Sequence, residues 1–308
     1  MTNIIVFLKG GVKDNVTILL LSLSMSDFTF LSLLTPRICT LIITHHAPDW
    51  NWPFSSSLLY VLLYWPAYTF YDFSSHASVW LGVTRCACIA MPLQFKSVFT
   101  KARTIKAVQA LFALAVSLRV PVMSMFRVKW RKETHTNSSF PYVARSYSQS
   151  TVRFNDIVNR ISIPWIEFII MIACVTIIRL KLHQAFLVRQ SHTSTSAAYF
   201  KRTNTSCNEQ GRSAKDLRVI QSVVLICCIF ILSQLPFLVY STVRLVNPEI
   251  AVFRRLENLL YILTNISGTC SYLNASVNIF VYYDYNRRYR AIFRSMFKFK
   301  LANVGSDR

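Results

Sequence analysis

The chain has 308 residues, of which 53% are hydrophobic, and charged residues make up only 15% against about 25% in an ordinary soluble domain. Its 34 Lys and Arg against 13 Asp and Glu give a net charge of +21, which indicates a chain that faces nucleic acid or anionic lipid. Apolar runs of about 20 residues favour the membrane over nucleic acid, because runs of this length cross a bilayer as helices. A soluble nucleic-acid binder and a disulfide-stapled secreted domain are therefore excluded.

The apolar runs predict an all-α, seven-transmembrane helix bundle whose first helix is truncated. Residues 1–8 are apolar but too short to span, and no small-residue cleavage site follows, so we interpret them as the end of a span rather than as a signal peptide. We expect the transmembrane domain to cover residues 1–283. Six complete runs follow the partial one, at residues 16–36, 57–83, 107–126, 158–180, 219–246 and 257–283.

Residues 284–308 are expected to form a short amphipathic helix and a cytoplasmic tail. Tyr289, Ile292, Phe293 and Phe297 share one helix face there, and basic residues lie opposite. This pattern is typical of a helix that lies on the inner leaflet of a membrane.

Basic residues are distributed unevenly between the two sets of loops. One set carries 22 Lys and Arg and the other carries 10. Since cytoplasmic loops are rich in Lys and Arg, we predict that the first set and the C-terminus are cytoplasmic and that the N-terminus is outside. The sequon Asn137-Ser-Ser falls in an outer loop and predicts glycosylation there. The first set is 9–14, 85–106, 179–218 and 284–308, and the second is 37–56, 127–157 and 244–257.

Asp27 lies deep in the second span, where an ionisable group needs partners on other helices. Ser74 of the third span is one candidate, and Asn274 and Asn278 of the last span are others, because residues four apart share a helix face. A carboxylate with amide and hydroxyl oxygens suits a small hard cation or a water cluster. A polar contact between helices without a cation is the alternative.

Asp72, His76 and Glu167 are also intramembrane, and each could line a water-filled crevice or pair with its neighbours. The sequence has no G-x-S-x-G, no H-E-x-x-H and no phosphate-binding loop, and no nucleophile lies beside a base. The eight cysteines contain no C-x-x-C pattern. We therefore predict neither an enzyme nor a zinc protein.

Four segments resemble the rhodopsin-like (class A) G-protein-coupled receptors. Leu23-x-x-x-Asp27 is similar to the family's L-A-x-x-D, and the stretch from Thr84-Arg85 to Pro92-Leu93 is similar to D-R-Y-x-x-I-x-x-P-L. Phe230 precedes Pro236 by six residues in the sixth span, and Asn278-Ile-Phe-Val-Tyr282 is similar to N-P-x-x-Y. All four occur in order and on the right spans. The basic context of these segments most resembles invertebrate neuropeptide-receptor-like and gastropod chemosensory receptors.

The resemblance implies a plasma-membrane receptor that passes the binding of an extracellular ligand to a heterotrimeric G protein. It places a possible allosteric sodium ion at Asp27, Ser74, Asn274 and Asn278, and it implies no other cofactor. Arg85 would be the arginine that is restrained at rest and meets the G protein on activation. Thr84 replaces its usual acidic neighbour, so Asp216 is expected as the restraining partner. The other residues implied in coupling and switching are Pro92, Leu93, Phe230, Pro236, Asn278 and Tyr282.

The ligand site is expected between the outer halves of the helices. Tyr64, Tyr68 and Tyr71 form a stripe, although such a stripe can also be packing alone, and Ala67 stands where aminergic relatives carry an aspartate. A biogenic amine is therefore not expected. Two arginines and a basic loop favour a neutral or anionic ligand, such as an amidated or acidic peptide or a small polar odorant. The facing residues implied by the resemblance are Asp156, Arg160, Gln234, Phe237, Arg244, Tyr261 and Tyr272.

Several positions depart from the family pattern. Gln234 replaces a tryptophan, Ile279 replaces a proline, and Tyr60 replaces the cysteine at the outer end of the third span. The 127–157 loop has no cysteine, so the disulfide that usually pins it is not expected, which predicts a more mobile outer lid or a divergent receptor of reduced stability. A seven-span ligand-gated channel and a non-signalling receptor fragment remain the alternative functions.

Overall fold

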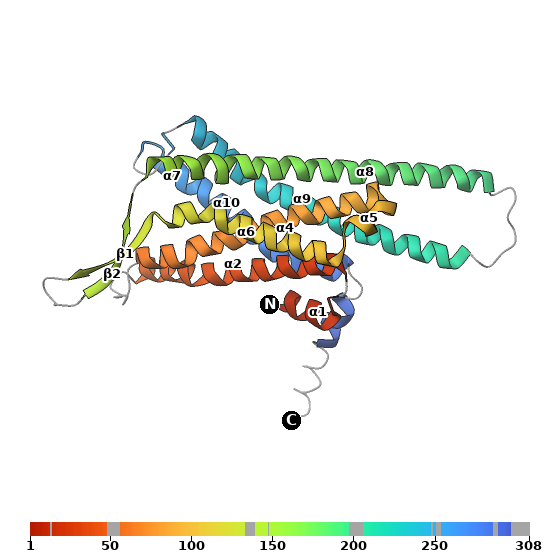
Figure 1. The fold of residues 1–308 in the computed structure, drawn as a ribbon, viewed down its shortest axis with the longest axis horizontal. Helices are drawn as coiled ribbons and strands as arrows, with labels where there is room; N and C mark the ends of the chain where they lie inside the picture. Colours follow the sequence, from red (N-terminus) through yellow and green to blue (C-terminus); the bar gives the residue numbers. More distant parts are fainter. Residues whose placement is uncertain are drawn as a thin grey trace, which may run out of the picture.

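The structure is a computed structural model that describes residues 1–12, 14–47, 56–132, 139–146, 148–196, 206–247, 249–250, 254–285 and 289–296. Within these residues the long helices run roughly along one axis and pack into a bundle (Figure 1). A β-hairpin lies at one end of the bundle and the short helix α5 lies toward the other (Figure 1). We name these two ends the hairpin end and the α5 end.

Seven helices of the described chain correspond to the predicted spans. They are α1 (Thr2–Gly10), α2 (Asn15–His46), α4 (Trp65–Ala90), α6 (Lys101–Met123), α8 (Ile163–Ser196), α9 (Ser206–Val246) and α10 (Glu257–Tyr285). Shorter segments join them: α3 (Ser56–Leu59) and a π-helical segment, Tyr60–Tyr64, lead into α4, and α5 spans Pro92–Val98. Helix α7 (Gln149–Phe154) and a second π-helical segment, Asn155–Ser162, lead into α8.

Local sequence explains where several helices begin and end. Pro92 opens α5, where its missing N–H is not needed. Thr100 caps α6, since its hydroxyl accepts a hydrogen bond of 3.4 Å from the backbone N–H of Arg103. Helix α6 ends at Met123, just after Pro121, so the apolar run 107–126 continues past the end of its helix. Phe126 instead begins a strand.

The outer surface of the bundle is apolar. Leu232 and Phe280, for example, are 70% and 67% exposed. Among the described residues, four helical stretches are long and apolar enough to cross a membrane, namely Asn15–His46, Lys101–Met123, Ser150–Gln184 and Val224–Val246. Helices α4 and α10 are more polar, because they carry buried groups such as Asn278 and His76 that face the interior.

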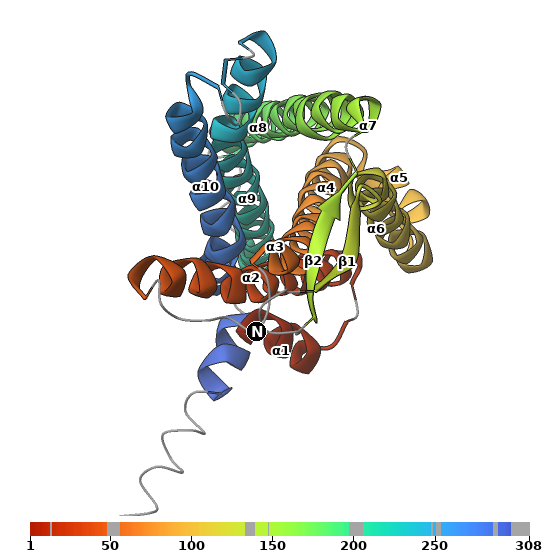
Figure 2. The same ribbon diagram turned by 90° about the vertical axis from the view of Figure 1, so that its left-hand side faces the viewer.

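Helix α4 is the central helix of the bundle and packs against α2, α6, α8 and α9. Figure 2, which looks along the bundle, shows α4 between α2 and α8. Buried residues therefore occur on several of its faces, including Ala67, Phe73 and Leu81. Because α4 touches so many helices, its polar side chains at successive turns meet partners from different neighbours.

The hairpin pairs β1 (Phe126–Lys132) with β2 (Ser139–Arg145) in antiparallel register, with Phe126 opposite Arg145. The ring of Phe126 lies 5.8 Å from that of Trp65, and Trp65 is buried with Val122 and Met125. Apolar packing on α4 and α6 thus anchors the base of a loop that has no cysteine to pin it. The sequon residue Asn137 lies outside the described residues.

Helix α1 packs against the C-terminal helical segment, residues 289–296. The ring of Phe7 lies 5.3 Å from Tyr282 and 5.6 Å from Tyr289, and Ile292 and Phe293 pack on the same cluster. Burial raises the pKa of Tyr289 to about 12, so its hydroxyl stays protonated and donates to Asn3 Oδ1. Phe297 lies outside the described residues.

Candidate functional site

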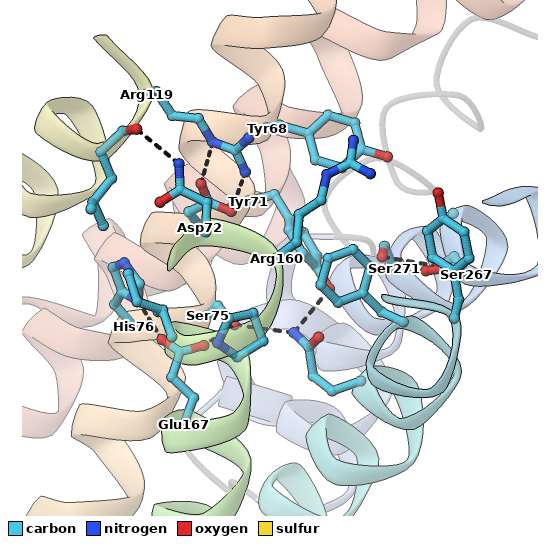
Figure 3. Close-up of a pocket in the computed structure, with 18 of the residues that line it drawn as sticks. Tyr68, Tyr71, Asp72, Ser75, His76, Arg119, Arg160, Glu167, Ser267 and Ser271 are labelled. Carbon is cyan, nitrogen blue, oxygen red and sulfur yellow. Dashed lines mark hydrogen bonds and ion pairs between the residues drawn. The ribbon is translucent and has the colours of Figure 1, made fainter. Parts of the chain in front are cut away.

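A cavity opens in the hairpin half of the bundle, between α4, α6, α8, α9 and α10 (Figure 3). Tyrosines and Trp65 line one part of it, and charged and amide side chains line another. It begins next to Trp65, so the base of the hairpin adjoins it. The elements that enclose it come from distant parts of the chain, which makes the cavity a product of the tertiary fold.

Asp72 and Arg119 form a bidentate ion pair between α4 and α6. Arg119 Nε donates to Asp72 Oδ2 at 2.5 Å, and Nη2 donates to Oδ1 at 2.8 Å. Their side chains are only 22% and 11% exposed. The planar guanidinium matches both carboxylate oxygens, which is the strongest geometry for such a pair. Each charge therefore neutralises the other inside the bundle.

A second polar group links α4 to α8 and α9. His76 Nδ1 contacts Glu167 Oε1, and the Ser75 hydroxyl donates to Glu167 Oε2 at 3.0 Å. The amide of Gln234 donates to Ser75 Oγ at 3.1 Å and to the hydroxyl of Tyr71 at 3.0 Å. Figure 3 shows the contacts of Glu167 with His76 and Ser75. Three helices are thus joined through one continuous network.

A cluster of charges adjoins the cavity at Arg160, which belongs to its wall. Asp156 Oδ1 lies 3.4 Å from Arg160 Nε, and Asp156 Oδ2 lies 3.7 Å from Arg244 Nη2. One carboxylate therefore serves two guanidinium groups. Both pairs are about 30% exposed, so water screens them more strongly than it screens the Asp72–Arg119 pair.

The structure brings six of the predicted ligand residues to the cavity wall and places four elsewhere. Asp156 and Arg244 pair with each other just outside the wall. Tyr272 packs on Phe30 of α2, with rings 5.9 Å apart, and Tyr261 is 52% exposed and donates to Glu257. Helix α10 instead presents Thr264, Ser267, Gly268 and Ser271 to the cavity. The six in the wall are Tyr64, Tyr68, Tyr71, Arg160, Gln234 and Phe237.

Several lining residues were absent from the predicted ligand set. Asp72, His76 and Glu167 had the signal of an ionisable group inside a span, and the structure places all three in the wall. Arg119 carries the same signal near the end of the fourth run. Asn159 donates a hydrogen bond to the Leu118 carbonyl of α6 and has no comparable sequence signal, because a single amide in a span commonly forms a hydrogen bond between helices.

Asp27 sits in a separate buried site closer to the α5 end. Ser74 Oγ donates to Asp27 Oδ1 at 2.5 Å, and Asn278 Nδ2 donates to Asp27 Oδ2 at 2.8 Å. Ser24 and Tyr282 lie beside this group, and their hydroxyl oxygens are buried without a hydrogen-bond partner among the described residues. Asn274 makes no described contact with Asp27. Three of the four predicted sodium ligands thus converge.

At the α5 end, Arg85 is half-buried, and its buried Nε has no hydrogen-bond partner in the described part of the chain. Asp216 belongs to α9, but its side chain lies outside what the structure describes, as do those of Pro92 and Leu93. Phe230 is 1% exposed and packs with Met171 and Cys227. Pro236 lies inside α9, six residues after Phe230 and thus nearly two helical turns from it.

Comparison with known protein families gives one match across this architecture. A family model described as 7 transmembrane receptor (rhodopsin family) matches residues 3–282. The matched range contains the whole cavity wall, the Asp27 group and Arg85. A comparison with curated proteins found no match.

Proposed function

Because the chain belongs to the rhodopsin family of seven-transmembrane receptors, we propose that it transmits the binding of an extracellular ligand to a heterotrimeric G protein. Receptors of this family are multi-pass proteins of the plasma membrane and are not enzymes. The observation that carries the proposal is a polar cavity enclosed by five helices at the hairpin end, with a half-buried arginine at the other end of the same helix α4. A ligand in the cavity can therefore bias α4, α8 and α9 together.

The proposed orientation places the hairpin end outside and the α5 end in the cytoplasm. The support is the excess of Lys and Arg in the segments near α5 and the C-terminus. The cavity then opens to the extracellular side and Arg85 faces the G protein.

We propose a peptide or a small chemosensory molecule as the ligand, as in the invertebrate neuropeptide-like and chemosensory receptors that the sequence resembles. A biogenic amine fits poorly, because both cavity carboxylates already have ionic partners, Asp72 in Arg119 and Glu167 in His76. Ala67, where an amine receptor has its aspartate, is fully buried in an apolar cluster with Phe30. A cationic ligand would have to displace one of these internal pairs.

We also propose that Asp27, Ser74 and Asn278 hold a sodium ion. The donor set is one carboxylate with hydroxyl and amide oxygens, which suits a small hard cation. The unpartnered hydroxyls of Ser24 and Tyr282 beside Asp27 fit a site that completes its hydrogen bonding with an ion and water. A bound ion would neutralise Asp27 and favour the packed state of α2, α4 and α10.

The first test asks whether Arg85→Ala removes nucleotide exchange. The receptor in lipid nanodiscs is mixed with purified G proteins, and GTPγS uptake is measured with and without a pool of amidated peptides and polar odorants. The wild-type chain should accelerate exchange and Arg85→Ala should abolish that acceleration at equal receptor concentration. Ligand-gated currents that persist in Arg85→Ala, without any exchange, would establish the channel instead.

The second test concerns the proposed restraint between Arg85 and Asp216. Asp216→Ala should raise ligand-independent exchange, because losing an interhelical ion pair worth about 1 kcal/mol shifts the resting equilibrium about fivefold. Glu209→Ala, a second acid in α9, serves as the matched control and should leave basal exchange unchanged. Equal basal exchange in wild type and Asp216→Ala, at equal expression, would show that the pair does not restrain the receptor.

A further inference from the structure

Two buried polar atoms in the cavity wall lack a hydrogen-bond partner among the described residues. They are Nε2 of His76 and Oδ1 of Asn159. His76 is only 7% exposed. Buried polar atoms in proteins are nearly always paired, and an unpaired one in a cavity wall marks a position where a bound molecule completes the hydrogen bonding.

The orientation of the Asn159 amide is determined by its neighbours. Its Nδ2 donates to the carbonyl oxygen of Leu118 at 2.9 Å and to Asn155 Oδ1 at 3.2 Å. A carbonyl oxygen only accepts, so the nitrogen has to face Leu118. Oδ1 is therefore the unpartnered atom, and it calls for a hydrogen-bond donor.

His76 offers the opposite polarity. Its Nδ1 contacts Glu167, and a buried pair without net charge is strongly favoured over one that carries a net charge. Two forms meet this condition, the imidazolium with a carboxylate and the neutral imidazole with a carboxylic acid whose proton bonds Nδ1. In both forms Nε2 carries a hydrogen, so Nε2 is a donor that calls for an acceptor.

The charged groups of the wall leave little place for a charged ligand. Asp72 pairs with Arg119, Glu167 with His76, and Arg160 with Asp156. The two deep pairs, Asp72–Arg119 and Glu167–His76, are compensated, so an ionised group beside them would lose its hydration without gaining an unpaired counter-charge. The excess positive charge lies in the partly exposed cluster of Asp156 with Arg160 and Arg244. The aromatic part of the wall, which includes Tyr64 and Tyr68, supplies stacking surface instead.

From these observations we propose that the cavity recognises an uncharged ligand through an amide group. The amide carbonyl accepts from His76 Nε2, the amide N–H donates to Asn159 Oδ1, and an attached aromatic or apolar part packs on the tyrosines. An amide provides an acceptor and a donor side by side without a charge. The inference rests on the proposed receptor function, and it specifies the ligand class of the same site.

The experiment uses four probes of similar shape on the full chain in nanodiscs: benzamide, methyl benzoate, benzoate and benzylamine. Binding is followed by the concentration dependence of the thermal unfolding midpoint. Benzamide should raise the midpoint and bind at least about tenfold more tightly than the ester, the anion or the amine. Equal or tighter binding of any of these three, or no binding of benzamide, overturns the proposal.

Two variants locate the probe in the cavity. His76→Asn keeps an amide N–H near Glu167 but removes the Nε2 position, and Asn159→Ser shortens the acceptor. Asn159→Ser should weaken benzamide about tenfold and leave methyl benzoate nearly unchanged, because an ester has no N–H to donate, whereas His76→Asn should weaken both, since both carbonyls accept from Nε2. His183→Asn, at an exposed position of α8, is the matched control and should bind like wild type. Undiminished benzamide binding in a folded His76→Asn or Asn159→Ser protein would contradict the assignment.

The binding measurement contains no G protein, so its outcome separates the two proposals. If benzamide binds as described but no ligand produces nucleotide exchange, the amide site stands and the receptor function fails. If an anion or an amine drives exchange and amides do not bind, the receptor function stands and the amide site fails.

Discussion

Asp72→Asn should lower the free energy of unfolding by about 2–3 kcal/mol, because it leaves a buried guanidinium without its carboxylate. In the native chain Arg119 donates two hydrogen bonds to Asp72, at 2.5 and 2.8 Å, and is only 11% exposed. The asparagine oxygen can replace one of these bonds but not the charge. The measurement is the thermal unfolding midpoint in detergent, followed with a thiol-reactive dye, since Cys174 and Cys227 are buried free thiols.

A double-mutant cycle separates the pair from its surroundings. Arg119→Gln alone should also destabilise, whereas Asp72→Asn with Arg119→Gln should cost about 1–2 kcal/mol less than the sum of the two. Asp156→Asn is the matched control, because that carboxylate is about a third exposed and its loss should change stability by less than about 1 kcal/mol. Additive effects within the cycle would mean that the pair is not coupled.

The polar residues of the spans were visible in the sequence, but their partners were not. Asp27, Asp72 and Glu167 stand out because an ionisable group in an apolar run is expensive. Which groups meet depends on helix rotation and on crossings between helices 47 or more residues apart, as for Asp72 with Arg119 and for Ser75 with Glu167. Hydropathy gives no information on helix rotation or on helix crossings. The sequence therefore shows which side chains need a partner, but not which partner each of them meets.

Predicted facing residues failed to reach the cavity where a helix carries competing interactions. Tyr272 belongs to the same stretch of α10 as Ser271, but its ring packs on Phe30 of α2, so the smaller serine faces the cavity. The alternation of Phe126, Val128 and Trp130 with basic residues is a strand signal of period two, which the net charge of the loop and its lack of cysteine do not reveal. Local periodicity thus predicts the strand in this loop, whereas in the helix bundle it does not predict which side chains face the cavity.

Sodium should stabilise the wild-type chain, and Asp27→Asn should remove that response. A ligand of the folded state at ten times its dissociation constant stabilises by about 1.4 kcal/mol, so the unfolding midpoint in NaCl should exceed that in choline chloride at equal ionic strength. Asparagine keeps the size of the side chain and one acceptor for Ser74 or Asn278, but it lacks the charge that holds a cation.

Two further variants distinguish an ion site from a polar contact between helices. Asp27→Ala should lose the sodium response and also destabilise by about 2 kcal/mol, because the buried amide of Asn278 and the hydroxyl of Ser74 lose their acceptor. Asp284→Asn, exposed at the end of α10, is the matched control and should retain the full response. If Asp27→Asn and wild type respond equally to sodium, the ion binds elsewhere. If wild type does not respond, Asp27 serves only to join α2, α4 and α10.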